Sequence, residues 1–249
     1  MVKKESRNIS MVTRLTQALH FVQKETGAVL PPIQLTSTYA RDSSYEIRKP
    51  YWYRRSGSET TYHAEKIIAE LEDAQESMLF TSGMSACTAV IEHLPAGSHV
   101  VIPKVMYHGV LQQFQNFEKN KRLDISYYSA GNIQEIEYAL RPKETKLVWV
   151  ETPNNPNWEV TDIEAAAEIT HGAGAKLLCD CTGTPPCMTR SLNMNADFSF
   201  HSATKYLNGH SDITAGVLSV REIGKFWEEI SCIRNLQGTV LNSFDAWLL

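Results

Sequence analysis

The sequence predicts an α/β protein whose mainly parallel sheet is flanked by helices. From residue 61 onward, short apolar runs of strand length alternate with stretches in which apolar residues recur at helical spacing. This alternation indicates βαβ units, because two parallel strands need a crossover connection that a helix usually provides. The chain has 249 residues, of which 43% are apolar and 21% charged. That balance is typical of an ordinary globular protein.

The elements follow one another in a regular order. Residues 1–60 have weak periodicity and several prolines, which predicts an extended arm with one short helix near residues 12–24. The predicted helices span residues 62–75, 84–93, 133–140 and 163–171, and a further one ends near Phe117. The predicted strands span residues 99–103, 123–128, 146–151, 176–180, 197–201 and 215–220. We therefore expect an arm, 1–60, and a large domain, 61–249.

Charge, hydropathy and cysteine usage exclude several classes of function. The net charge of −4 is mild and gathers into no long block, so no nucleic-acid partner is expected. No apolar run approaches the ~20 residues that span a bilayer, so no membrane partner is expected. The N-terminus also lacks the apolar segment of a secretory signal. The five cysteines show no spacing typical of a zinc site or a disulfide framework. We expect no metal, and reduced thiols in a cytoplasmic protein.

Functional groups gather just after the predicted strands. Right-handed crossovers place these strand-end loops along one edge of the sheet, where such sheets bind ligands. Neither the dinucleotide motif nor the P-loop motif is present. Instead, Ser82-Gly83-Met84 opens a predicted helix. Its bare N–H groups and the positive end of the helix dipole suit a phosphate, and an ordinary helix cap is the alternative.

Two other strand-end segments carry reactive groups. Asp180 closes an apolar strand, where an unpaired buried carboxylate is costly and needs a cation. A protonated pyridine nitrogen is one such cation, and a plain N-cap is the alternative. Ser202 and Thr204 place two hydroxyls beside Lys205 just after another strand. Hydroxyls can hold phosphate oxygens, and a lysine there can attack a carbonyl to form an imine.

The lysine segment also permits a second mechanism. Ser202-x-x-Lys205 matches the S-x-x-K motif of serine acyl enzymes. That mechanism needs a K-T-G triad far downstream, and the sequence has none. Tyr206-Leu-Asn208 adjoins the lysine too closely to serve as the accessory Y-x-N across a cleft. A serine acyl enzyme is therefore the least favoured of the readings.

A long and specific pattern surrounds the lysine. His201-Ser-Ala-Thr-Lys-Tyr-Leu-Asn-Gly-His-Ser-Asp212 resembles the pyridoxal 5′-phosphate (PLP) lysine signature of the cysteine/methionine metabolism enzymes. This family includes cystathionine γ-synthase, cystathionine γ- and β-lyases and methionine γ-lyase. Glu151-Thr-Pro-Asn-Asn-Pro156 is similar to the family's E-S/T-P-x-N-P. The resemblance covers nearly the whole chain and implies the large domain of a fold-type I PLP-dependent transferase.

The resemblance assigns roles to residues of this chain. Lys205 would form the imine with PLP, Asp180 would pair with the pyridine nitrogen, and Tyr107 would stack on the ring. The cofactor-binding residues that the resemblance implies are Tyr53, Arg55, Ser82, Gly83, Met84, Tyr107, Asn155, Asp180, Thr182, Ser202, Thr204 and Lys205. Tyr53 and Arg55 would reach the phosphate of a neighbouring subunit. A homodimer or homotetramer with shared active sites is therefore expected.

The implied reaction is γ-elimination or γ-replacement on a homoserine- or homocysteine-type amino acid, as in trans-sulfuration. The chain departs from the family at Ser58-Glu59-Thr60 (N-P-T), Tyr107-His-Gly-Val110 (Y-G-G-T) and Asp180-Cys-Thr-Gly-Thr-Pro-Pro186 (D-N-T-F-A-T-P). We expect these departures to face the substrate. Two alternatives thus stay open: a γ-lyase for a non-sulfur γ-substituted amino acid, and a PLP-binding relic without turnover. The sequence stops inside an apolar helical pattern, so we expect a truncated chain that lacks the family's small C-terminal domain.

Overall fold

A computed structural model describes residues 10–16, 19–48 and 51–249. Its helices are α1 (Met11–Thr16), α2 (Glu59–Glu72), α3 (Gly83–His93), α4 (His108–Lys119), α5 (Ile133–Ala139), α6 (Ile163–Gly172), α7 (Lys225–Gln237) and α8 (Ser243–Leu248). Its strands are β1 (Glu76–Phe80), β2 (Ser98–Pro103), β3 (Leu123–Tyr128), β4 (Thr145–Glu151), β5 (Lys176–Asp180), β6 (Phe198–His201) and β7 (Gly216–Val220). Two short 3₁₀ helices, η1 (Arg54–Ser56) and η2 (Ser191–Met194), complete the described elements.

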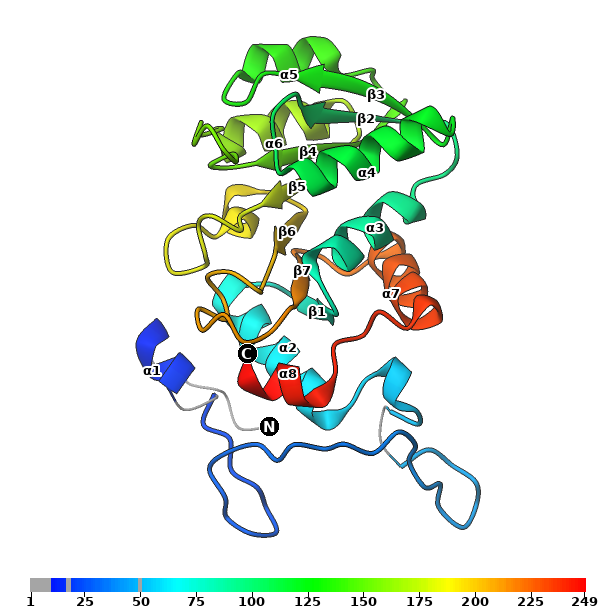
Figure 1. The fold of residues 1–249 in the computed structure, drawn as a ribbon, viewed down its shortest axis with the longest axis vertical. Helices are drawn as coiled ribbons and strands as arrows, with labels where there is room; N and C mark the ends of the chain where they lie inside the picture. The colour runs from blue at the N-terminus through cyan, green and yellow to red at the C-terminus, as the bar shows by residue number, and fades with distance from the viewer. Residues whose placement is uncertain (1–9, 17–18, 49–50) are drawn as a thin grey trace.

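Within the described residues, seven strands form one sheet in the order β1-β7-β6-β5-β4-β2-β3 (Figure 1). The pairs from β6 to β3 are parallel, whereas β7 runs antiparallel to both of its neighbours. Since β1 is antiparallel to β7, it points the same way as β6. The predicted α/β fold with a mainly parallel sheet is confirmed.

Sequence reasoning missed one strand of this sheet, β1, and one of the helices that pack on it, α7. Strand β1 was not predicted, because its apolar run, Met78–Phe80, is only three residues long and cannot be assigned to a strand by periodicity alone. Helix α7 was not predicted either, since few of its side chains, Trp227 and Ile230 among them, are buried. The helix predicted near residues 12–24 is shorter in the structure: α1 ends at Thr16, and residues 17–18 lie outside the described residues.

Helices cover both faces of the sheet. Side chains of α3, α4 and α7 share one apolar cluster with alternate residues of the strands, such as Leu178 of β5. The intervening residues, such as Cys179, pack on the other face with α5 and α6, and a further cluster there includes α2 and α8. Because successive strand residues point to opposite faces, this double burial explains the continuous apolar runs of the central strands.

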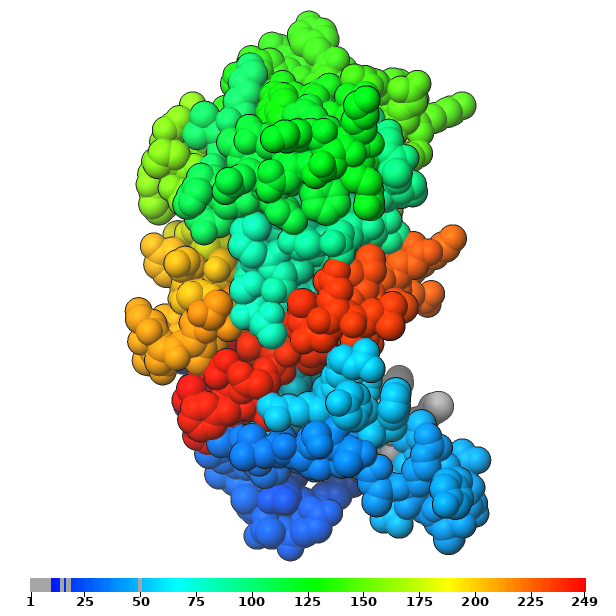
Figure 2. All heavy atoms as spheres, turned by 45° about the vertical axis from the view of Figure 1, so that its right-hand side comes forward, coloured from blue at the N-terminus to red at the C-terminus, as the bar shows by residue number. Residues whose placement is uncertain are grey.

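The arm packs against α2 and α8 of its own chain. Figure 2 shows the arm in blue beneath the red C-terminal helix and the cyan segment that contains α2. The hydroxyl of Thr60 donates to the carbonyl of Pro32, and the indole of Trp247 donates to the carbonyl of Pro31. Ser58 caps α2 by accepting the N–H of Thr61, so this helix starts before the predicted residue 62. The arm boundary at residue 60 stays a prediction.

No helix among the described residues is both long and apolar enough to cross a membrane. All five cysteines are free: Cys87, Cys179 and Cys181 are buried, whereas Cys187 and Cys232 are exposed. The described residues contain no group of three or more His, Cys, Asp or Glu side chains placed to hold a metal ion.

Candidate active site

Two acidic residues end neighbouring strands at the same edge of the sheet. Glu151 closes β4 and Asp180 closes β5, and the two are register partners. Their exposed fractions are only 5% and 4%. Burial raises the pKa of Asp180, although the hydroxyl and N–H of Thr182 oppose the rise. Burial and the nearby charge of Asp180 together raise the pKa of Glu151 to about 7.

Among the described residues, Asp180 receives its hydrogen bonds from Thr182. It accepts the N–H of Thr182 at 3.0 Å. Within the part of the chain that the structure describes, no lysine or arginine forms an ion pair with it. A buried carboxylate without a cation is costly. The site therefore fits a positively charged ligand group such as a protonated pyridine nitrogen.

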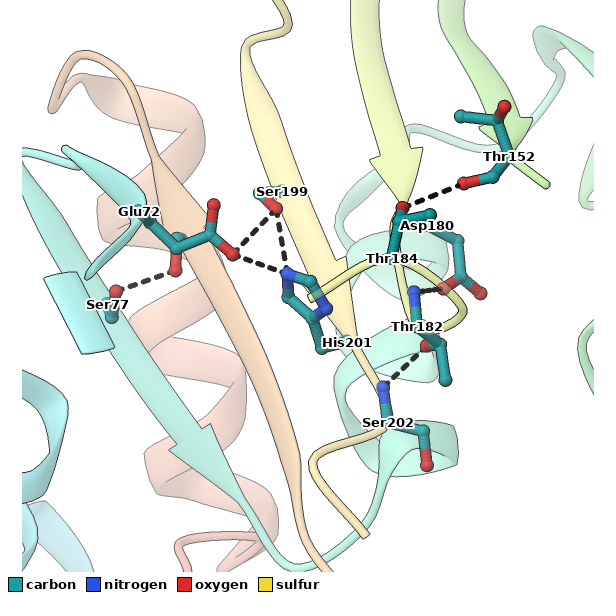
Figure 3. A network of polar contacts seen from close by, with 10 residues as sticks. Glu72, Ser77, Thr152, Asp180, Thr182, Thr184, Ser199, His201 and Ser202 are labelled. Atoms are coloured by element: carbon teal, nitrogen blue, oxygen red, sulfur yellow. Dashed lines mark hydrogen bonds and ion pairs between the residues drawn. The ribbon is translucent and has the colours of Figure 1, made fainter. Parts of the chain in front are cut away.

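Thr182 joins the end of β5 to the lysine segment. Its hydroxyl accepts the N–H of Ser202 at 2.8 Å, so Asp180, Thr182 and Ser202 form one connected chain of contacts (Figure 3). The hydroxyl of Thr204 donates to the carbonyl of Ala215 at 3.1 Å and accepts its N–H at 2.9 Å. These bonds fix the turn that carries Lys205, whose side chain is exposed. Phosphate binding by Thr204 stays a prediction.

The lysine segment meets the N-terminus of α3. A Cβ atom built on Gly83 would lie 3.2 Å from Cβ of Ser202, which places the two segments side by side. Ser82 is the N-cap and accepts the N–H of Ser85 at 3.0 Å. The N–H groups of Gly83 and Met84 precede the first intrahelical hydrogen bond and have no partner within the helix. Ser82 is thus a plain cap, and the cap leaves an anion-binding helix end facing Ser202.

Glu151 connects two further predicted site residues to this edge. One carboxylate oxygen accepts the N–H of Tyr107 at 2.8 Å, and the other accepts the N–H of Asn155 at 2.6 Å. Tyr107 is 40% exposed and precedes α4. Sequence reasoning did not select Glu151, although it heads the Glu151–Pro156 motif. Its role depends on a contact with Tyr107, which is distant in sequence.

Tyr53 and Arg55 lie on the arm, and Arg55 lies next to the C-terminal end of α7. Arg55 donates to the carbonyl of Asn235 at 2.8 Å, near the C-terminus of α7. It also lies over the ring of Tyr53 and beside Gly238. The next residue, Thr239, accepts the N–H of Thr81 at 2.9 Å, just before Ser82. Arg55 is therefore close to the phosphate segment of its own chain, and a role at a neighbouring subunit's phosphate stays a prediction.

The departures at residues 58–60 serve the fold. Ser58 is buried, caps α2 and shares a hydrogen bond with the hydroxyl of Ser243. Thr60 is buried and accepts the N–H of Gln34 at 2.9 Å. Both side chains are committed to packing the arm and α8 against α2. These two residues therefore do not indicate a changed substrate site.

A second buried polar network lies on the opposite face of the sheet. Ser199 and His201 of β6 contact the carboxylate of Glu72, which ends α2 (Figure 3). All three are almost completely buried. Phe198 and Phe200 point to the α3 side, so Ser199 and His201 point to the α2 side. This network fixes the end of β6 against α2, and Lys205 follows β6 in the chain.

The chain is similar to a known family and to known proteins. The family described as Cys/Met metabolism PLP-dependent enzyme matches residues 13–249. The chain is 34% identical to cystathionine γ-lyase of Dictyostelium discoideum over 98% of its length, and 35% identical to cystathionine β-lyase of Coxiella burnetii over 94%. The matches cover 62% and 61% of those relatives, so the chain spans about three fifths of their length.

Solved structures of similar proteins superpose on this chain. The crystal structure of metB from Corynebacterium glutamicum superposes with a TM-score of 0.91 at 31% identity, covering 97% of this chain and 62% of that one. A cystathionine γ-synthase from Xanthomonas oryzae pv. oryzae, in complex with aminoacrylate and cysteine, superposes with the same TM-score at 30% identity and the same coverage of both chains.

Proposed function

The chain belongs to the Cys/Met metabolism PLP-dependent enzyme family, and from this we propose that its strand-end edge binds PLP and catalyses γ-elimination or γ-replacement on a homoserine- or homocysteine-type amino acid. The observation that carries the proposal is Asp180. It is a buried carboxylate with which no described lysine or arginine forms an ion pair, on the edge where Ser202 meets the N-terminus of α3. The ring nitrogen and the phosphate of one ligand match these two features.

Each proposed contact follows from the chemistry of the group. Asp180 would hold the pyridine nitrogen protonated, because the carboxylate gains a cation only in that form. The N–H groups of Gly83 and Met84, with the hydroxyl of Ser202, would bind the phosphate. Tyr107 would cover one face of the ring. When bound, PLP supplies the electron sink for a carbanion at the substrate Cα.

The lysine is the proposed acid–base group. Its exposed side chain follows a turn that Ser202 and Thr204 hold in place. The amine of Lys205 would remove the Cα proton of the amino acid and carry protons during departure of the γ-substituent. Asn155, exposed at the end of the same edge, would contact the substrate.

Spectroscopy and turnover test the proposal separately. Protein incubated with PLP should show a visible absorbance band that borohydride abolishes, and peptide mapping should then find the cofactor mass on Lys205. A panel containing cystathionine, methionine and an O-acylhomoserine with a thiol should give a 2-oxo acid or a new thioether. Absence of the band would overturn PLP binding. A band with no turnover on any substrate would overturn the catalytic part and leave a PLP-binding relic.

We also propose that the active sites are shared within a homodimer or homotetramer. Several apolar side chains of the arm are exposed in the single chain: Val29, Leu30, Leu35, Ile47 and Trp52. We infer that a second chain covers these side chains, since exposed apolar surface often marks a protein–protein contact. A second copy that covered the arm would bring Arg55 near a neighbouring phosphate segment, where its guanidinium can form charge-assisted hydrogen bonds.

Subunit mixing tests the shared sites. Inactive Lys205→Ala protein is mixed with Arg55→Ala protein under conditions that allow subunit exchange. Shared sites predict partial recovery of turnover, because some hybrid sites combine an intact Lys205 with an intact Arg55. No recovery despite demonstrated exchange would assign Arg55 to its own chain, in agreement with its contact at Asn235.

The free thiols support a cytoplasmic location as part of this proposal.

A further inference from the structure

Glu151 joins two segments that are distant in the sequence. It stands at the end of β4, and each of its carboxylate oxygens accepts one backbone N–H. The N–H of Tyr107 comes from the residue that precedes α4, and the N–H of Asn155 comes from the loop after β4. The distances of 2.8 Å and 2.6 Å are those of strong, charge-assisted hydrogen bonds.

Only a carboxylate can make this bridge from that position. Two N–H donors require two acceptor oxygens, and an ionised carboxylate has acceptors on both oxygens. A glutamine of the same shape has one acceptor oxygen and one NH₂ donor. In place of Glu151 it would satisfy one N–H and direct its own donor at the other. The neutral isostere should therefore release one of the two segments.

The position of Tyr107 is set at both its backbone and its ring. Glu151 fixes the N–H, and the ring lies against Gly109, where an added Cβ would be 2.8 Å from the ring atom Cε1 of Tyr107. The same Cβ would be 3.3 Å from the sulfur of Met84, so the ring stands beside the start of α3. A side chain at position 109 would displace the ring. Glu151 is therefore the backbone anchor of an otherwise exposed aromatic residue.

Glu151 has no other described role that requires its charge. It is buried next to Asp180, its register partner, and this neighbour makes an ionised form less favourable. The N–H groups of Tyr107 and Asn155 oppose that effect and favour the charged form. An apolar side chain would avoid the cost of two adjacent buried carboxylates. The two N–H groups that Glu151 holds offset part of this cost.

We propose that Glu151 is a positioning residue that holds Tyr107 and Asn155 in register with Asp180, so that ring-stacking and substrate-binding groups are in place before PLP arrives. This inference rests on the proposed function. Asn154 supports the arrangement from the next loop position, since its side-chain amide donates to the carbonyl of Val105 at 3.2 Å. The loop after β4 is thereby tied twice to the segment that leads into α4.

The test compares Glu151→Gln with Asp197→Asn in the full-length protein. Asp197 is the matched control: it is a buried carboxylate that accepts a backbone N–H, from Leu177, at the opposite edge of the sheet. Amide hydrogen exchange, followed by mass spectrometry without cofactor, is the first readout. Glu151→Gln should accelerate exchange in peptides covering residues 104–110 or 152–158, and Asp197→Asn should leave both unchanged. Unchanged exchange in both peptides of Glu151→Gln would overturn the bridge.

PLP titration is the second readout. Loss of one charge-assisted hydrogen bond predicts a PLP dissociation constant raised by about 10-fold to 100-fold in Glu151→Gln. Glu151→Asp, which keeps the charge on a shorter side chain, should recover part of this loss. Wild-type affinity in Glu151→Gln would overturn the positioning role even if exchange is faster. If the wild type binds no PLP, the proposed function fails, and the exchange experiment still decides whether Glu151 holds the two segments.

Discussion

Two buried aspartates on neighbouring strands differ in what surrounds them. Asp197 precedes β6 at one edge of the sheet, and Asp180 ends β5 at the other. Asp197 is bound by Lys176 at 2.8 Å, by His171 at 2.8 Å and by the N–H of Leu177 at 2.9 Å. Burial alone would raise its pKa, but these donors outweigh burial and hold the pKa of Asp197 below its ordinary value.

Asp180 is equally buried and has the opposite electrostatics. Its described hydrogen-bond donors come from Thr182, and burial outweighs them and raises the pKa of Asp180. Asp197 has Lys176 as a charged partner, whereas no lysine or arginine among the described residues forms an ion pair with Asp180. Uncompensated charge at the carboxyl ends of the strands is therefore a physical sign of a binding edge.

The largest expected effect is at Lys205. Lys205→Ala should lower turnover by about 10⁴-fold, because in the proposed function one amine would both anchor PLP and move the substrate protons. Steady-state rates on the best substrate of the panel give the measurement, and circular dichroism checks that the fold is intact. Substantial residual turnover would contradict the proposal that the strand-end edge is catalytic.

Asp180→Asn tests whether turnover requires the negative charge of Asp180. The variant should retain PLP but lose about 100-fold in turnover, because a neutral amide cannot stabilise a protonated ring nitrogen. Without cofactor, the same variant should unfold at a higher denaturant concentration than wild type, since a buried unpaired charge is gone. PLP content, turnover and urea unfolding provide the three measurements. Turnover near the wild-type rate would contradict the distinction between the two aspartates.

The stability of the protein should depend on pH in opposite ways through Glu151 and through Asp197. The pKa of Glu151 rises from 4.5 to about 7 on folding, so the native state binds more protons than the unfolded state between these values. The free energy of unfolding of the cofactor-free protein should therefore fall as pH rises through this window, by on the order of 3 kcal/mol. The pKa of Asp197 is lowered on folding, so Asp197 stabilises the folded protein at pH values above its ordinary pKa. This contribution is lost as the pH falls.

Urea unfolding of wild type and Glu151→Gln, in steps from pH 5 to pH 8, isolates the contribution of Glu151. The difference in unfolding free energy between the two proteins should change across the window, because all other titrating groups are shared. A constant difference would mean that Glu151 titrates near its ordinary value in the folded protein.

The smallest expected effect is at Asp197. Asp197→Asn should lower the free energy of unfolding by about 2 kcal/mol at neutral pH, since it weakens charge-assisted hydrogen bonds from Lys176 and His171. Turnover and PLP affinity should stay within about twofold of wild type, because the residue lies at the opposite edge. A large loss of turnover in a folded Asp197→Asn protein would show that the two edges are not independent.

Much of the fold was predictable because its signals are local. The bounds of β3 and β5 match the predicted ranges, since apolar runs flanked by turn residues identify buried strands. Strand β1 was missed because its run is short and lies between two helices. The antiparallel direction of β7 was not predictable, because the sequence contains no local signal for the neighbour with which a strand pairs.

The sequence by itself determined the chemistry that each strand end carries. The cap at Ser82, the hydroxyls around Lys205 and the carboxylate of Asp180 all depend on residues that adjoin in the chain, so their spacing already indicates a phosphate site and an acid–base group. Only the tertiary structure decided which charges are compensated. Asp180 ends an apolar strand and Asp197 precedes one, and of the two Asp197 alone, among the described residues, forms an ion pair with a lysine, Lys176 of β5. Glu151 likewise reaches Tyr107 only because β4 and the start of α4 meet at one edge. Compensation is a property of three-dimensional neighbours, and these are set by strand order and helix packing rather than by local spacing.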